Sequence, residues 1–91
     1  MITPTVGRVV WYYPGGAVQK SEGQPNAALV ACVCDDGKVN LGYFDASGNA
    51  QSDQCIVLVQ AGEPIPECGP FCEWPAIERP AKLKESIHAH G

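Results

Sequence analysis

The sequence predicts an all-β protein, a small five-stranded antiparallel barrel of the SH3-like kind, and three observations lead there. The chain has 91 residues, which suffices for one hydrophobic core and not for two. Its apolar stretches are short and rich in β-branched residues. Ten glycines and eight prolines separate these stretches, as expected of strands joined by turns. An OB-like barrel is the alternative, which the shortness of the strands disfavours.

The strands can be placed in order along the chain. Residues 7–14 are β-branched and aromatic and end on a proline, so they form the first strand. Residues 15–24 are glycine-rich and polar, which predicts a flexible, solvated connector. The remaining strands are expected at residues 26–34, 39–44, 50–60 and 71–75. Tight turns at residues 35–38 and 45–49 and a proline-rich crossing loop at 61–70 connect them.

Two of these strands are apolar at odd and even positions alike, over residues 27–34 and 55–59. A strand with one solvated face alternates instead. In a barrel one face of each strand fills the interior and the other points outward, so these outward side chains need a cover. The simplest cover is a second copy of the chain, and we therefore expect a homo-oligomer.

The barrel domain is expected to span residues 1–76, with a C-terminal tail at 77–91. The composition changes there, because the tail holds three of the six Lys and Arg residues and two of the ten carboxylates. Residues 81–88 place Leu83 and Ile87 four positions apart, which predicts a short helix. A helix of two turns is marginal alone and needs a surface on which to dock.

Charge and hydropathy exclude several classes of partner. The formal net charge of −4 disfavours binding to nucleic acid or to an anionic membrane. The longest apolar run, residues 27–34, is much shorter than the roughly 20 residues of a membrane-spanning helix. The opening MITP has neither the basic nor the apolar region of a secretory signal. We expect a soluble protein of the cytoplasm.

The five cysteines are expected to be free thiols, since their number is odd and no export signal precedes them. A zinc site built on Cys68 and Cys72 is the alternative, but three intervening residues are more than the usual knuckle has. We expect no metal and no cofactor. Cys32, Cys34 and Cys55 are then small buried apolar side chains.

Residues 3–12, TPTVGRVVWY, resemble the opening of a family of small, mostly uncharacterised tailed-phage and prophage proteins, which begin TPTVGRIVHY. The segments AALV at 27–30, VNL at 39–41, FDASGN at 44–49 and EWP at 73–75 follow in the family's order, so the resemblance covers about residues 3–76. It implies a phage gene product with a small β-barrel that works in the host bacterial cytoplasm, and it brings no firmly assigned activity. Trp11 stands where the family often has His, so any role of that imidazole is lost here. The pair Cys68 and Cys72 is not part of the family's pattern.

An enzyme is not expected. No histidine precedes the tail, so a Ser or Cys nucleophile has no histidine base. The adjacent carboxylates of Asp35 and Asp36 lie in a hairpin turn, where solvation explains them. The sequence contains no phosphate-binding glycine loop and no zinc-protease motif.

The candidate ligand is a nucleotide, because an aromatic platform beside a guanidinium can stack a base and hold a phosphate. If the first and last strands are neighbours, Trp11 and Trp74 approach each other, with Arg8 on the same strand as Trp11. The asparagines would hydrogen-bond the edge of the base. The candidate ligand-binding residues are Arg8, Trp11, Tyr13, Asn26, Asn40, Tyr43 and Trp74. The alternative is that Trp11 and Tyr43 are ordinary barrel core and that Arg8 pairs with an acidic neighbour.

Some phages carry small oligomeric proteins that sequester nucleotide signals of host immunity. By analogy of size and origin, we expect a counter-defence protein of this type. The alternative is a structural or interaction protein that docks on a phage or host protein. The doubly apolar strands and the pair Leu83 and Ile87 favour it, and exposed aromatic side chains of an SH3-like barrel can also bind an extended peptide.

Overall fold

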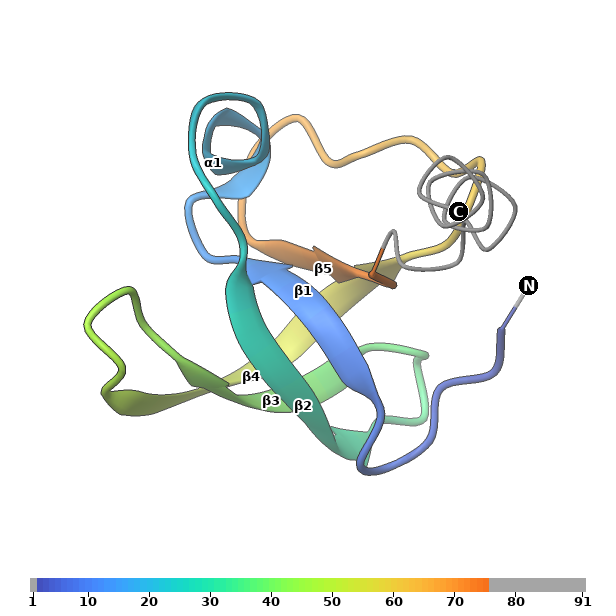
Figure 1. The fold of residues 1–91 in the computed structure, drawn as a ribbon. Coiled ribbons are helices and arrows are strands. Elements are labelled where there is room, and N and C mark those ends of the chain that lie inside the picture. The colour runs from blue at the N-terminus through green and yellow to red at the C-terminus, as the bar shows by residue number, and fades with distance from the viewer. Residues whose placement is uncertain (1, 76–91) are drawn as a thin grey trace, which may run out of the picture.

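The structure is a computed structural model that describes residues 2–75. The described chain has one helix and five strands, and the strands form a barrel (Figure 1). The elements in chain order are β1 (Val9–Tyr13), α1 (Gly16–Glu22), β2 (Asn26–Val33), β3 (Val39–Phe44), β4 (Ala50–Val59) and β5 (Phe71–Glu73). The tail expected at residues 77–91 and its helix lie outside the described residues.

The five strands close into a ring in which each strand pairs with the next and β5 pairs with β1. This confirms the small five-stranded barrel. Four of the pairs are antiparallel, whereas β4 and β5 run parallel. An odd number of strands around a closed ring cannot alternate in direction throughout, so at least one pair must be parallel. A parallel pair needs a long connection, and residues 60–70 provide it.

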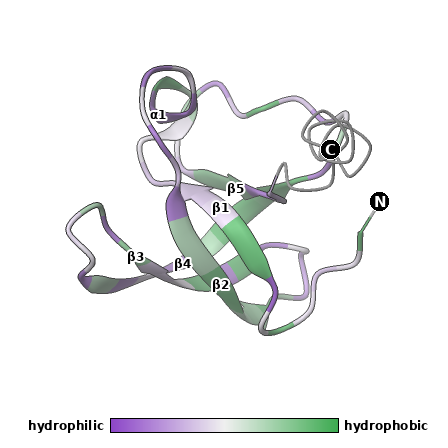
Figure 2. Cartoon of the chain, viewed as in Figure 1, coloured by the Kyte–Doolittle hydropathy of each residue, from purple (hydrophilic) through white to green (hydrophobic). Residues whose placement is uncertain are grey.

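The interior of the barrel is filled by inward-facing side chains from all five strands. β1 contributes Val10 and Tyr12, which are 0% and 1% exposed. Their neighbours in this core are Ala28, Val30, Val39, Leu41, Ile56 and Cys72. The strands are therefore hydrophobic along much of their length (Figure 2). Burying side chains of this size contributes about 1.5–3 kcal/mol each, which is the main stabilisation of a domain this small.

A second, smaller core lies on the outside of the barrel, where the 60–70 loop covers β1, β5 and the end of β4. Tyr13, Val59 and Phe71 form it, with Trp11 and Ile65 packed against them. The rings of Tyr13 and Phe71 are stacked, with centroids 4.9 Å apart. Part of the outward apolar surface of the barrel is thus covered by the chain's own loop.

The prediction of a flexible connector at residues 15–24 is wrong, because this segment contains α1. The residues that follow the glycine pair, AVQKSE, are ordinary helix formers, and they outweigh the breaking effect of the glycines. The Lys20 ammonium pairs with the Glu73 carboxylate, to which the Tyr13 hydroxyl also donates at 2.7 Å. These contacts fix α1 against β1 and β5. Within residues 2–75, no helix has the length and apolarity needed to cross a bilayer.

The two tight turns form as predicted. Gly37 and Gly48 both adopt φ +88°, a left-handed conformation that glycine adopts without steric cost. The Asp45 carboxylate accepts the backbone N–H groups of Ser47 and Asn49. These hydrogen bonds, the one from Asn49 above all, lower the pKa of Asp45. Figure 1 shows the β3–β4 hairpin projecting beyond the rest of the barrel.

The prediction that Cys32, Cys34 and Cys55 are buried is wrong. Cys32 and Cys55 are exposed and Cys34 is half-buried. The pairing register shifts once between β2 and β3 and once between β3 and β4, and such bulges change which face a side chain takes. Cys55 itself has φ +59°, which interrupts the alternation of β4.

Candidate functional site

The guanidinium of Arg8 lies over the indole of Trp74, with its central carbon 4.9 Å from the ring centroid. Arg8 precedes β1 and Trp74 follows β5. Because these strands pair antiparallel, with Trp11 opposite Glu73, the start of β1 and the end of β5 lie side by side. Arg8 is exposed and Trp74 is half-buried against the barrel core. The structure thus brings together two of the seven predicted ligand-binding residues, in a cation–π contact.

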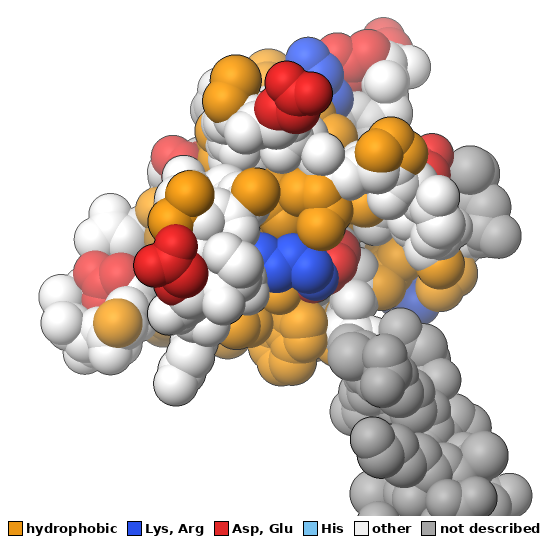
Figure 3. Space-filling view, turned by 90° about the horizontal axis from the view of Figure 1, so that it is seen from above, with side chains coloured by type: hydrophobic (Ala, Val, Ile, Leu, Met, Phe, Trp, Pro, Cys, Tyr) orange, Lys and Arg blue, Asp and Glu red, His pale blue; other side chains and the backbone are white. Residues whose placement is uncertain are grey.

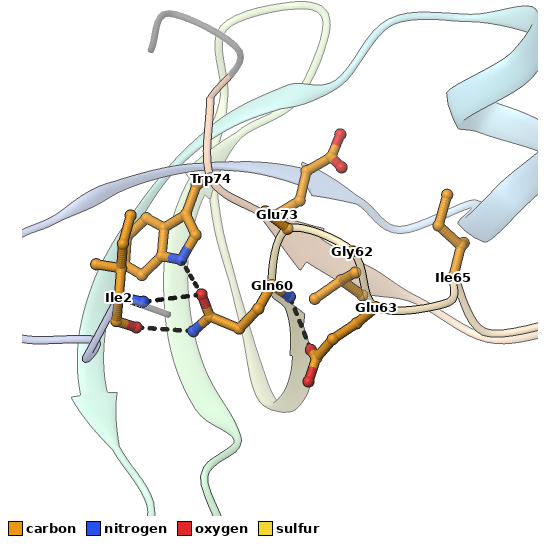
Figure 4. Close-up of a pocket in the computed structure, with 9 residues that line it drawn as sticks. Ile2, Gln60, Gly62, Glu63, Ile65, Glu73 and Trp74 are labelled. Atoms are coloured by element: carbon orange, nitrogen blue, oxygen red, sulfur yellow. Dashed lines mark hydrogen bonds between the residues drawn. The ribbon is translucent and has the colours of Figure 1, made fainter.

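Gln60 holds the Trp74 ring in place (Figure 4). The indole Nε1 donates to Gln60 Oε1 at 2.9 Å. The same oxygen accepts the backbone N–H of Ile2 at 3.2 Å, and Gln60 Nε2 donates to the Ile2 carbonyl at 2.7 Å. One amide side chain therefore holds both the aromatic ring and the N-terminal segment in place.

A cavity of about 330 Å³ lies beside Trp74, between the N-terminal segment and the start of the 60–70 loop. Its apolar lining includes Ile2 and Ile65, and its two carboxylates are Glu63 and Glu73. The Glu63 carboxylate accepts the backbone N–H of Gln60 at 2.8 Å, and that of Glu73 accepts from Lys20 and Tyr13. The volume is at the lower end of the ~300–1,000 Å³ of small-molecule sites. Lys20 compensates the charge of Glu73, whereas Glu63 has no cationic partner among residues 2–75, so the cavity suits an uncharged group better than a phosphate.

Figure 3 shows the molecule from above, on the face that carries α1 and the 60–70 loop. Hydrophobic side chains emerge there between acidic and cationic ones, so no charge of one sign dominates this face. Arg8, Lys20 and Lys38 are the only cations in the described part of the chain. Lys20 forms an ion pair with Glu73, and this is the only ion pair among residues 2–75. Arg8 and Lys38 therefore have no carboxylate partner within these residues.

Trp11 and Tyr13 lie on the other face of the sheet from Trp74. They belong to the second core outside the barrel, whereas Trp74 packs against the interior core. The Trp11 and Trp74 rings therefore do not form one platform. The pKa of Tyr13 is raised, first by burial and then by its hydrogen bond to Glu73. Tyr13 positions that carboxylate, and through it α1.

Tyr43 packs against the interior core, beside Tyr12 and Asp53, and within residues 2–75 it is not among the residues in contact with Arg8 or Trp74. The rings of Tyr12 and Tyr43 meet edge to face with centroids 4.8 Å apart. Tyr12 donates its hydroxyl to Asp53 Oδ2 at 2.6 Å. Burial, and then the Asp53 carboxylate, raise the pKa of both tyrosines. Sequence reasoning missed Asp53, since one carboxylate in the polar run of residues 51–54 carries no signal that it faces the barrel interior.

The two asparagines each link elements of the fold. Asn26 Oδ1 accepts from Gln19 Nε2 at 3.2 Å, which ties α1 to the start of β2. Asn40 Oδ1 accepts the backbone N–H of Cys55 at 3.0 Å and the thiol of Cys34 at 3.7 Å. Neither asparagine contacts Arg8 or Trp74 in the hydrogen bonds of the described residues.

Three of the five cysteines, Cys32, Cys34 and Cys55, lie near one another. The thiols of Cys32 and Cys55 lie near Cys34 and, after burial, are the next causes that raise its pKa. Cys68 is exposed on a loop while Cys72 is buried in the barrel. Across residues 2–75 no three His, Cys, Asp or Glu side chains are placed to hold a metal ion together.

Comparison of the chain with protein-family models, with curated proteins and with solved structures gives no match. The family resemblance carried by residues 3–12 therefore stays a prediction. Function has to be inferred from the side chains, and the contact between Arg8 and Trp74 is the arrangement on which that inference rests.

Proposed function

We propose that this chain is a non-enzymatic binding protein of phage origin that sequesters an anionic nucleotide in the host cytoplasm, as a homo-oligomer. The observation that carries the proposal is the Arg8 guanidinium over the Trp74 ring. Arg8 is exposed and has no carboxylate partner among residues 2–75. An unpaired guanidinium next to a fixed indole offers both a bidentate phosphate contact and a stacking surface.

The surroundings of Arg8 and of Trp74 suit different parts of a nucleotide. The phosphate belongs at Arg8, because the neighbouring cavity carries the carboxylates of Glu63 and Glu73. The uncharged base or sugar belongs on Trp74 and in the cavity, where Ile2 and Ile65 supply apolar contacts. This arrangement favours a small ligand with a compact anionic group over an extended nucleic acid, which also agrees with the net charge of −4.

Binding is tested by the thermal stability of the full chain in the presence of cyclic dinucleotides and ADP-ribose-derived nucleotides. A ligand that binds the native state adds RT ln(1 + [L]/Kd), about 2.7 kcal/mol at a hundredfold excess over Kd. Arg8→Lys keeps the charge but loses the planar fork, so it should weaken the shift, and Trp74→Phe should weaken it through lost stacking. Lys38→Ala removes a positive charge from an exposed hairpin turn, away from Arg8 and Trp74, and should leave the shift unchanged.

Two results decide the proposal. A nucleotide that stabilises the wild-type chain and the Lys38 variant clearly more than it stabilises the Arg8 and Trp74 variants supports it. If no nucleotide in the panel moves the transition, or if the Arg8 and Trp74 variants respond like the wild type, the ligand site is refuted.

A second candidate function is a structural or interaction protein that docks on a phage or host protein. The observation that favours it is the exposure of large apolar side chains on the outer face of the barrel, where Val9, Leu29 and Phe44 are 48%, 49% and 53% exposed. A virion component would be detected by mass spectrometry in purified phage particles. Its absence from those particles would exclude the virion role.

A further inference from the structure

An apolar hollow of about 250 Å³ lies on the outer face of β1, β2 and β3. We call it the outer patch; its outward-facing residues are Val9, Ala27, Leu29, Gly42 and Phe44. The ladder explains why they meet, since Leu29 lies between Val9 of β1 and Gly42 of β3 in register. Ala27 and Phe44 lie two positions further along their strands, on the same face.

The outer patch differs from the rest of the barrel's outer apolar surface in having no cover. Over the outer face of β1 and β5, the 60–70 loop covers Tyr13 and Phe71, which are 5% and 0% exposed. Nothing in residues 2–75 does the same for Leu29 or Phe44, which are about half exposed. Exposed side chains this large, gathered on one face, mark a contact surface.

The outer patch has a projecting side chain, Phe44, which we call the knob, beside an open space over Gly42, which we call the hole. Gly42 has no side chain, and a Cβ built there would have no atom within 4 Å, so the space above it is open. Phe44, two residues further along β3, stands beside that space and lines a second hollow of about 530 Å³ on its other side. The Phe44 ring therefore projects beside Gly42, which lies on the same strand and has no side chain.

The charge of the patch points to what covers it. No charged residue lines the hollow over Gly42, although the chain as a whole carries a formal net charge of −4. Two copies of an acidic chain repel each other, so they associate most readily through an uncharged surface. A knob and a hole on the same face are also what a two-fold contact needs, because each copy supplies both halves.

We propose that the occupant of the outer patch is a second copy of this chain, related by a two-fold axis. Phe44 of each copy enters the space over Gly42 of the other. The inference rests on the proposed homo-oligomer and names its interface. Arg8 and Trp74 do not line the patch, so ligand binding and association can be tested apart.

Size-exclusion chromatography with light scattering on the full 9.7 kDa chain tests the proposal. The wild type should have twice this mass at micromolar concentration. Phe44→Asp removes the knob and places a charge in the interface, and it should raise the dimer dissociation constant about 30-fold or more. Gly42→Val fills the hole and should have the same effect. Circular dichroism should show both variants folded, because the Gly42 site has open space for the added side chain.

The matched control is Val18→Asp, which places the same charge at an exposed valine of α1, outside the patch, and should remain dimeric. A wild type that is monomeric at all concentrations overturns the proposal, and so do Phe44 and Gly42 variants that keep the dimer mass. A dimer that binds no nucleotide refutes the ligand proposal alone, whereas a monomer that binds one refutes the interface alone.

Discussion

A Cβ atom placed on Gly16 would lie 2.7 Å from the carbonyl oxygen of Gly69. Gly16 is the buried first residue of α1, and Gly69 lies at the end of the loop that leads into β5. The absence of a side chain at Gly16 therefore lets the helix and the loop touch. Since this loop also covers the second core, the contact joins α1 to the cover of that core.

Gly16→Ala should lower the free energy of unfolding by about 2 kcal/mol or more. Gly16 has φ +71°, which costs an L-residue about 1 kcal/mol, and the steric overlap with Gly69 adds to that cost. Urea denaturation measures the loss. Gly37→Ala is the control, because Gly37 has φ +88° but no atom within 4 Å of a built Cβ. If the two variants lose equal stability, the contact with Gly69 does not constrain the fold.

Tyr12→Phe should destabilise the chain more than Tyr13→Phe does. The Tyr12 hydroxyl is the hydrogen-bond donor to half-buried Asp53, and removing a bond to a charged group costs about 1.5–3 kcal/mol. Glu73 keeps the ammonium of Lys20 when the Tyr13 hydroxyl is lost, so its carboxylate stays partnered. Chemical denaturation at pH 7 compares the two variants. A larger loss for Tyr13→Phe would mean that Asp53 is solvated instead.

Alkaline destabilisation should depend on Cys72. Burial, with a smaller contribution from the neighbouring Glu73, raises the pKa of this thiol from 9.0 to about 12. Between these values the unfolded chain has released the proton and the folded chain still holds it. Stability therefore falls as the pH rises, by at most about 1.4 kcal/mol per pH unit from this group, and is fully retained below pH 9.

Denaturation curves between pH 8 and 10 test this dependence. Cys72→Ala should show a shallower fall in the free energy of unfolding than the wild type, from a lower starting value because a buried sulfur is lost. Cys68→Ala, which removes an exposed thiol close to the same strand, controls for the loss of a cysteine. Equal slopes for the wild type and Cys72→Ala would contradict the buried neutral thiol.

The strands were predictable because their limits are encoded locally. The turn at Gly37 needs a positive φ that its Asp-Gly sequence supplies, and the next strand, Val39–Phe44, lies between this turn and the one at Gly48. Ring closure then placed β1 next to β5, which is why Arg8 and Trp74 meet. The same alternation puts Trp11 on the opposite face from Arg8, so a platform containing both tryptophans is incompatible with the period of a strand.

Other features depend on contacts that are distant in the sequence. The helix α1 is held by Lys20, whose partner Glu73 lies 53 residues away. Gln60 joins the Trp74 ring to the backbone of Ile2, which lies 58 residues away from Gln60 along the chain. The bulges that turn Cys32 outward arise from the register between neighbouring strands, and no local signal in β2 predicts them.

The five cysteines should react with a thiol reagent at different rates, which depend on where the strands and their bulges place them. In native protein at pH 8, an aromatic disulfide reagent should modify the exposed Cys32, Cys55 and Cys68 rapidly. Cys34 should react more slowly, since burial and its neighbouring thiols raise its pKa and leave less thiolate. Buried Cys72 should react only at the rate at which the barrel opens. Peptide mapping after timed labelling gives the order, and rapid labelling of Cys72, or protection of Cys32, would contradict the register of β2 and β5.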